Sequence, residues 1–371
     1  MFLRRRPLHA YGLSKGTNCI VLLGISLTLS GCAMRVGHKT ITRDRFDYAG
    51  ALSRSWKEQM LLNMVKLRYM DPPVFLDVAQ MIAQYTLEGS ASINAIDWAG
   101  VSAGSAGGVA GRWAESPTIT YNPMTGEKFI KSLMQPVPPV ALLSLVQAGW
   151  PVDGVFALGV RSVNGLHATS NIALLRHASD TNFLRLLGLL RELQLTDVFG
   201  LRVEEKEGVA GGILVFRSGL VSQEMTTKAQ EVRKLLHLSP DASEFKIVFG
   251  AVPRDGTEIA FQTRSMFEIL AEAAMGVEIP ASDLNEGRAT KTPAQGPTAG
   301  GTSTFLVQVR SSSGKPPAGD AFTAVHYRSH WFWVPDRDLP SKRGLGFLLV
   351  LFNLAESGTT ASPPILTISK P

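Results

Sequence analysis

The order helix-strand-strand occurs twice between residues 181 and 274, and its short connections limit the folds that the chain can adopt. Helical periodicity of apolar residues predicts helices over residues 181–193, 223–236 and 265–274. Alternation of apolar and polar residues predicts two hairpins, formed by residues 200–205 with 212–217 and by residues 244–249 with 258–263. Parallel strands would need a longer crossover within each pair. The pattern therefore predicts an α+β fold with repeated α-β-β units and an antiparallel sheet.

The N-terminus carries the most specific motif in the chain. Arginines at positions 4 to 6 precede an apolar stretch at residues 19–29, and Ser30 and Gly31 stand directly before Cys32. Residues 1–32 resemble the signal peptide and lipobox of a bacterial prolipoprotein. The resemblance implies that a signal peptidase recognises Leu29, Ser30 and Gly31, and that Cys32 becomes the lipidated first residue of the mature chain.

Two other interpretations of this segment remain open. It could begin a membrane-spanning helix, but small and polar residues leave it shorter than the roughly 20 apolar residues that a span needs. It could also be a signal that is cleaved elsewhere, which would leave Cys32 as an ordinary thiol.

Cleavage before Cys32 would change the charge of the protein. The chain has 37 basic and 31 acidic residues, but four basic and no acidic ones lie in residues 1–31, so the net charge falls from +6 to +2. A nearly neutral chain gives no electrostatic reason to expect binding to nucleic acid. Cys19 would be removed and Cys32 lipidated, so neither a disulfide nor a cysteine metal site is expected.

Composition and periodicity divide the mature chain into regions. At 45% apolar content, about 340 residues can bury a sizeable core without disulfides. The regions are a tether at 32–42, a helical region with a long hairpin at 43–150, an α+β domain at 151–283, a flexible linker or loop at 284–303, and strands with a helix at 304–371. The last region is expected to pack on the α+β domain, with its helix in the core. Residues 74–85 allow either helix or strand.

A stretch rich in glycine, alanine and serine, at about residues 86–121, predicts a long β-hairpin. Small, polar and apolar residues alternate in its two arms, and a glycine and alanine stretch at 99–108 separates them. The glycines do not have the spacing of a phosphate-binding loop.

This hairpin has two interpretations. Each arm exceeds the roughly 9 to 11 residues of a tilted membrane strand, but one copy could not insert alone, because its edges would stay unpaired in lipid. Several copies could form an oligomeric export pore, an arrangement similar to that of ring-forming export lipoproteins of the outer membrane. The arms offer little bulk toward lipid, so contact with a periplasmic partner is the preferred interpretation.

Residues with catalytic or metal-binding chemistry form no recognisable motif. The sequence has no nucleophile elbow, zinc-protease helix or Walker loop. His326 and His330 are four residues apart, but on one strand they would be separated by about 13 Å, too far for one zinc ion. Asp336 and Asp338 are expected to form a turn and to cap the next helix. We therefore expect no enzymatic activity, no cofactor and no metal site.

An aromatic stretch at residues 325–334 is a candidate for ligand binding. The stretch is predicted to form one strand, on which alternation places Tyr327, Trp331 and Trp333 on one face. An exposed face of this kind would stack on the sugars of a glycan such as peptidoglycan. The preferred interpretation is that these residues are sheet core under the final helix.

These observations predict an envelope protein. Ala33 follows the lipobox cysteine where aspartate would favour the inner membrane, so the resemblance to prolipoproteins favours the outer membrane. The body, including residues 116–121 and 336–338, resembles uncharacterised envelope lipoproteins of Gram-negative bacteria, which implies no activity and no functional residue. We expect a lipid-anchored, periplasm-facing lipoprotein that acts as a non-catalytic interaction or assembly component. Its expected partners are the membrane, through the anchor, and envelope proteins or further copies of itself.

Overall fold

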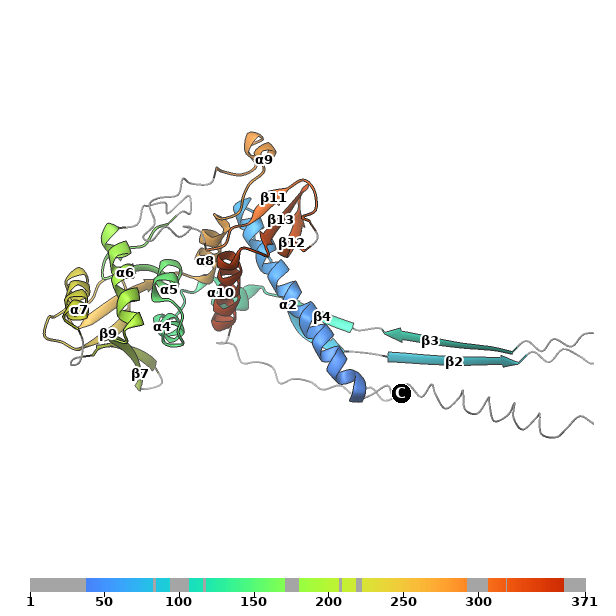
Figure 1. Ribbon diagram of the computed structural model, residues 1–371, viewed down its shortest axis with the longest axis horizontal. Coiled ribbons are helices and arrows are strands. Elements are labelled where there is room, and N and C mark those ends of the chain that lie inside the picture. Colours follow the sequence, from blue (N-terminus) through green and yellow to red (C-terminus); the bar gives the residue numbers. More distant parts are fainter. Residues whose placement is uncertain are drawn as a thin grey trace, which may run out of the picture. The chain divides into compact units, whose positions relative to one another are not determined.

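The computed structural model describes residues 38–82, 85–93, 107–115, 118–170, 180–206, 209–217, 222–291, 306–317 and 319–356. The chain divides into two compact units, Met1–Ser55 and Trp56–Pro371. Helix α2 (His38–Arg68) begins in the first unit and ends in the second, and the other described elements all belong to the second unit (Figure 1).

The second unit combines short helices with four sheets. After α2, the helical segments are α3 (Gly126–Phe129), the π-helix η1 (Ile130–Met134), α4 (Pro139–Gln147), α5 (Val152–Gly159), α6 (Thr181–Leu195), α7 (Gln223–Leu235), α8 (Met266–Ala274), α9 (Ala281–Asn285) and α10 (Leu339–Glu356). The described chain is therefore of the α+β class, as the sequence predicts.

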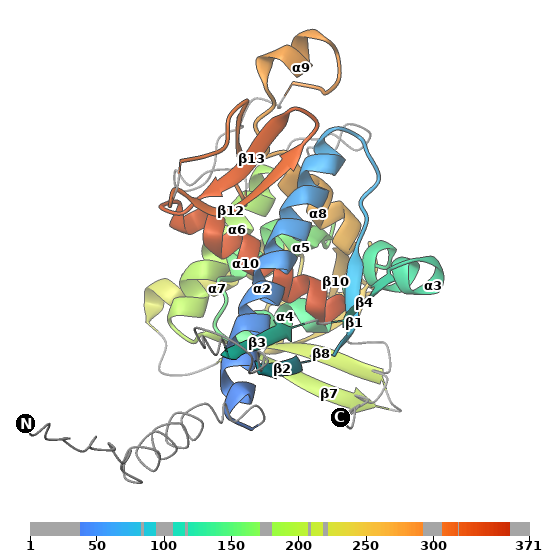
Figure 2. The ribbon, with the colours of Figure 1, turned by 90° about the vertical axis from the view of Figure 1, so that its right-hand side faces the viewer.

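The largest sheet has six strands in the order β6-β5-β10-β9-β8-β7. They are β5 (Val160–Val163), β6 (Leu166–His167), β7 (Phe199–Lys206), β8 (Val209–Phe216), β9 (Glu244–Phe249) and β10 (Glu258–Thr263). Helix α4 packs on β7, β8 and β9, and Figure 2 shows it beside this end of the sheet.

Three smaller sheets complete the unit. One has the order β11-β13-β12, from β11 (Arg310–Ser312), β12 (Ala321–Tyr327) and β13 (His330–Pro335). The other two are strand pairs: β1 (Leu76–Ile82) with β4 (Thr118–Pro123), and β2 (Tyr85–Ile93) with β3 (Gly107–Glu115). The segment 74–85, which the sequence left open, thus contains strand β1, and the tip of the predicted hairpin, residues 94–106, lies outside the described residues.

The predicted α-β-β repeat is only partly correct. Helices α6, α7 and α8 and the antiparallel pair β7 and β8 lie where the sequence predicts them. The second predicted hairpin is wrong, because β9 and β10 are parallel, with Glu258 opposite Lys246 and Phe261 opposite Phe249. The residues between them, 250–257, can reach about 26 Å when extended, which exceeds the roughly 20 Å length of a six-residue strand. This connection is therefore long enough to run back along the strand without a helix. The sheet contains both parallel and antiparallel pairs.

A buried arginine joins the sheet to the helices. Arg264, which is 4% exposed, donates hydrogen bonds to the carbonyls of Ala157 and Leu158 at 3.1 Å, near the C-terminal end of α5. It thereby satisfies carbonyls that a helix end leaves without intrahelical partners. The next residue, Ser265, starts α8 by a capping box with Glu268.

One hydrophobic core extends through the second unit. Helix α6 contributes an apolar face made of Phe183, Leu186, Leu187, Leu189, Leu190 and Leu193. Helix α10 buries Leu345, Phe347, Leu348 and Leu351, and the ring of Phe347 lies 4.9 Å from that of Trp150. The prediction that the last helix is a core helix is confirmed. Among the described helices, none is long and apolar enough to cross a membrane.

The end of α2 holds the segment that follows α8. Arg68 is wholly buried and donates to the carbonyl of Thr290 at 2.6 Å, while the Tyr69 hydroxyl donates to Asp283 Oδ2 at 2.5 Å. Asp283 lies in α9, so the predicted linker at 284–303 begins inside a helix that these contacts fix. Its remainder, residues 292–303, lies outside the described residues.

Candidate functional site

Of the residues predicted to have functional roles, the structure describes those for ligand binding but not those for lipidation. Leu29, Ser30, Gly31 and Cys32 lie outside the described residues. The aromatic stretch is described, but it is a hairpin and not one strand: β12 ends at Tyr327, Arg328 has a φ of 52°, and β13 starts at His330. A turn at this point reverses the chain and changes which residues share a face.

The shared face predicted for Tyr327, Trp331 and Trp333 is therefore wrong. Because Tyr327 lies opposite His330 in the register, it shares a face with Phe332, whereas Trp331 and Trp333 lie on the other face. Trp331 is half-buried, with His326 at 5.3 Å and the ammonium of Lys315 at 5.7 Å from its ring, and Trp333 is 9% exposed. These positions leave no three-residue stacking platform.

Tyr327 belongs instead to a polar cluster at the end of α2. Its ring lies 5.6 Å from that of Tyr69, and its hydroxyl donates to Asp71, which also pairs with Arg328 at 3.2 Å. The hydrogen bond from Tyr327, followed by that from Arg328, lowers the pKa of Asp71. The cluster joins β12 to the end of α2, which is a structural role.

The other titratable candidates also have structural roles. His326 and His330 lie on opposite faces of the hairpin, and no group of three potential metal ligands occurs among the described residues. Asp338 accepts hydrogen bonds from the backbone and hydroxyl of Ser341, at 3.1 and 2.7 Å, at the start of α10. Asp336 pairs with Lys342 at 2.7 Å. Both aspartates thus support the start of the helix, as predicted.

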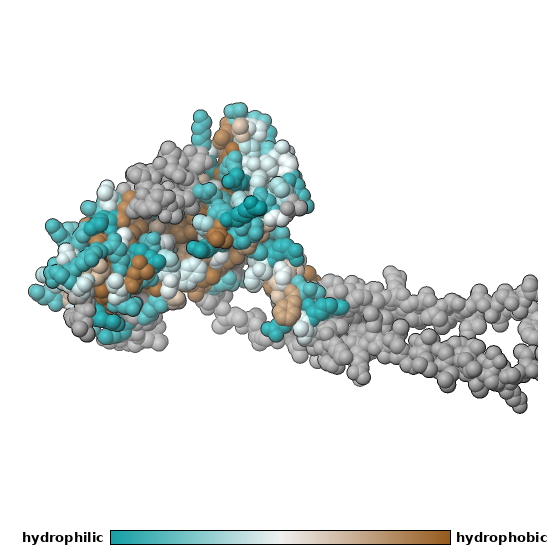
Figure 3. Space-filling model, viewed as in Figure 1, coloured by the Kyte–Doolittle hydropathy of each residue, from teal (hydrophilic) through white to brown (hydrophobic). Residues whose placement is uncertain are grey.

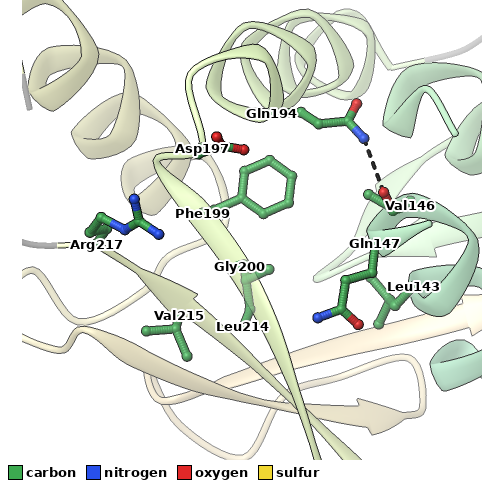
Figure 4. Close-up of a pocket in the computed structure, with 10 residues that line it drawn as sticks. All are labelled: Leu143, Val146, Gln147, Gln194, Asp197, Phe199, Gly200, Leu214, Val215 and Arg217. Carbon is green, nitrogen blue, oxygen red and sulfur yellow. Dashed lines mark hydrogen bonds between the residues drawn. The ribbon is translucent and has the colours of Figure 1, made fainter. Parts of the chain in front are cut away.

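A pocket of about 390 Å³ lies between α4, the α6–β7 connection and strands β7 and β8 (Figure 4). Its apolar lining comes from Leu143, Val146, Phe199, Leu214 and Val215, with Asp197, Arg217 and Gln147 at exposed positions and Gln194 beside them. Gln194 already binds the backbone, because its amide nitrogen donates to Val146 and Trp150, and its oxygen accepts from Val152. The polar groups are spread around the lining and do not converge on one point (Figure 4).

The strand pair of β1 and β4, here called the root ribbon, carries an exposed apolar face. The register places Leu76, Val78 and Met81 opposite Pro123, Tyr121 and Ile119. A bulge at Ala79 shifts the alternation by one residue, so Met81 remains on the same face as Val78. On this face Leu76 is 42% exposed, Ile119 37% and Tyr121 51%.

The opposite face of the root ribbon is polar. It carries Asp77, Gln80, Thr118, Thr120 and Asn122, with Ile82 as its one large apolar member. The ribbon is therefore amphipathic, and along β4 the residues of both faces are exposed. Single exposed apolar residues are common on proteins, and on the view in Figure 3 such residues are mixed with hydrophilic ones over the body. A row of them on one sheet face indicates an interaction surface.

Helix α2 fixes the chain at the start of the root ribbon. Asn63 exchanges two hydrogen bonds with the backbone of Val74, at 2.8 and 2.9 Å, and Gln59 exchanges two with Leu76, at 3.3 and 2.7 Å. Four residues along a helix advance about 6 Å, and two residues along a strand advance about 6.6 Å. Because these spacings match, the two amides bind the backbone as a neighbouring strand would, and they hold the ribbon in place.

Both strand pairs have edges without a neighbouring strand, although Gln59 binds the edge of β1 at Leu76. Within the described residues, β1 pairs with β4 alone and β2 pairs with β3 alone. A strand edge presents backbone donors and acceptors in a row and can add a further strand. The sequence predicted β-structure for β2, β3 and β4 but left β1 open, and it missed the exposed apolar face, which depends on the bulge at Ala79.

Comparison with models of protein families, with curated proteins and with solved structures finds no match to this chain.

Proposed function

We propose that this chain is a lipid-anchored lipoprotein of the outer membrane that faces the periplasm and acts by binding envelope proteins, without catalysis. The observation that carries the proposal is the exposed apolar face of the root ribbon, at Leu76, Ile119 and Tyr121. The lipobox resemblance at Leu29 to Cys32 supports the anchor.

The root ribbon suits protein binding for two physical reasons. Full burial of one large apolar side chain is worth about 1.5 to 3 kcal/mol, so covering several of them gives a substantial driving force. The unpaired edges supply backbone hydrogen bonds, which direct how a partner strand aligns. Gln59 and Asn63 hold the chain at the start of β1, which lowers the entropy cost of ordering that part of the ribbon on binding.

The anchor is tested by the change Cys32→Ala in the full precursor. We expect the variant to lose palmitate labelling and to leave the membrane fraction, because an unlipidated chain has lost the acyl chains that hold it there. The measurements are metabolic labelling, mature mass and fractionation. An unchanged mass and unchanged membrane binding would contradict the lipobox assignment.

Binding by the root ribbon is tested by Tyr121→Asp, with Thr120→Asp as the matched control on the polar face. Both positions are exposed, so each change should alter stability by less than about 0.5 kcal/mol. We expect Tyr121→Asp to reduce recovery of crosslinked envelope partners by about tenfold or more, since a carboxylate would be buried against the partner. Thr120→Asp should keep normal recovery. Equal recovery from both variants would exclude this face as the binding surface.

A further inference from the structure

The second strand pair, β2 with β3, also separates large apolar residues from most of its charged ones. Its register pairs Tyr85 with Glu115 and continues without a break to Ile93 with Gly107. Residues opposite each other share a face, and faces alternate along each strand. One face therefore carries Tyr85, Leu87, Gly89, Ala91, Ile93, Gly107, Val109, Gly111, Trp113 and Glu115.

The other face of this ribbon carries Thr86, Glu88, Ser90, Ser92, Gly108, Ala110, Arg112 and Ala114. Its two charged residues, Glu88 and Arg112, are register partners of opposite sign. Every large apolar residue of the ribbon thus belongs to the first face, the charges at 88 and 112 belong to the second, and Glu115 is the one charged residue of the first face, at the end of the ribbon. A ribbon with lipid on one face and water on the other shows such a division.

The length of the ribbon matches a bilayer. Each strand has nine residues, which span about 30 Å when extended, close to the thickness of the hydrocarbon core. The aromatic residues Tyr85 and Trp113 lie within two register positions of the same end of the ribbon. Aromatic residues of this kind are enriched where a membrane protein crosses the lipid–water boundary.

One ribbon cannot enter lipid alone, because β2 and β3 each keep an unpaired edge whose backbone groups would be unsatisfied there. Copies related by rotation about a common axis remove this obstacle. Rotation keeps all ribbons pointing the same way, so β3 of one copy lies antiparallel to β2 of the next. A closed ring pairs every edge.

We propose that several copies of this chain assemble into such a ring, with the Leu87 and Val109 face of each ribbon toward acyl chains and the Glu88 and Arg112 face toward a water-filled channel. The inference rests on the proposed function, and it names the partner as further copies of the same chain. It uses strands β2 and β3 alone.

The experiment compares two arginine substitutions at adjacent positions, Val109→Arg on the apolar face and Ala110→Arg on the polar face. Each full-length lipidated protein is extracted in mild detergent, its native mass is measured, and it is added to dye-filled vesicles of phosphatidylethanolamine and phosphatidylglycerol. We expect the lipidated protein without substitutions and the Ala110→Arg variant to form a large homo-oligomer and to release dye. Val109→Arg should release dye at least about tenfold more slowly, because every copy would place a guanidinium in lipid.

Several results would overturn the proposal: a monomeric unmodified protein, an oligomer that releases no dye, or equal release by the two variants. Circular dichroism of each variant checks that the body is folded, so that a loss of release can be assigned to the ribbon. A monomer that still co-purifies with other envelope proteins overturns the ring and leaves the proposed function standing. A monomer without any partner overturns both.

Discussion

Replacing Gly344 by alanine should lower the free energy of unfolding by about 2 kcal/mol or more, although alanine is the better helix former. Gly344 lies in α10, and a Cβ at this position would overlap the carbonyl oxygen of Leu306 and lie 2.8 Å from its Cγ. Either the helix or the backbone at Leu306 would have to move. Overpacking of this kind outweighs the roughly 1 kcal/mol that alanine gains over glycine in a helix.

The segment after Leu306 has little freedom to move away. Val307 and Val309 are buried in the core, at 0% and 2% exposure. Between them, the backbone nitrogen of Gln308 donates to the Ser341 hydroxyl at 2.8 Å, in the same helix as Gly344. A shift of Leu306 would strain these contacts, and this is why we expect a net loss of stability.

Gly346, two residues further along α10, provides the matched control. A Cβ at this position would meet nothing within 4 Å, so Gly346→Ala should raise the unfolding free energy by about 0.5 to 1 kcal/mol. Both variants can be compared by urea unfolding of the full chain in detergent, followed by tryptophan fluorescence. Stabilisation of both variants to the same extent would show that Leu306 does not press on the helix.

The sequence predicted correctly those helices and strands that are determined by residues close together in the chain. The helices α6, α7 and α8 follow apolar periodicity, and Ser265 with Glu268 forms a local cap that the residue types suggest. The hairpin of β7 and β8 follows from alternation and a short connection. The same reasoning failed for β9 and β10, because connection length does not determine strand direction when the connection can run back along the strand.

The candidate surface depended on information that the sequence does not display. The apolar face of the root ribbon exists because a bulge at Ala79 realigns Met81 with Val78, and a bulge is not visible in alternation alone. In the aromatic stretch, the chain turns at Arg328, a residue type that rarely adopts a positive φ. Contacts between residues far apart in the sequence could not be predicted either. Tyr69 and Asp283, for example, are hydrogen-bonded but 214 positions apart.

That long-range contact leads to the second large effect. Tyr69→Phe should lower the free energy of unfolding by about 2 to 3 kcal/mol, because it removes the donor to a buried carboxylate. The Tyr69 hydroxyl donates to Asp283 at 2.5 Å, and the Asp283 side chain is only 4% exposed. Neither neighbouring side chain makes a hydrogen bond that would replace the donor, since Arg288 Nη1 lies 3.9 Å and His330 Nδ1 lies 3.7 Å from the carboxylate oxygens.

Tyr327→Phe is the matched control, because it removes the same kind of bond from an exposed partner. Asp71 accepts from Tyr327 but is 38% exposed and also pairs with Arg328, so water and the guanidinium can replace the lost donor. We expect a loss below about 1 kcal/mol. Similar losses in the two variants would contradict the difference in burial that the contacts indicate.

The pH dependence of stability gives an independent measure of the Tyr69 hydroxyl. Burial, and secondly the hydrogen bond to Asp283, raises the pKa of Tyr69. Tyrosine in the unfolded chain loses its proton near pH 10. Above that pH the unfolded state binds fewer protons than the native state, so stability falls as the pH rises, whereas below it Tyr69 contributes no pH dependence. Between pH 10 and pH 11, the protein without substitutions should therefore lose about 1 kcal/mol more stability than Tyr69→Phe, because the unfolded tyrosine is only half deprotonated at pH 10. Equal slopes in urea unfolding at pH 10 to 11 would mean that the hydroxyl reaches water and that Asp283 is held by other groups.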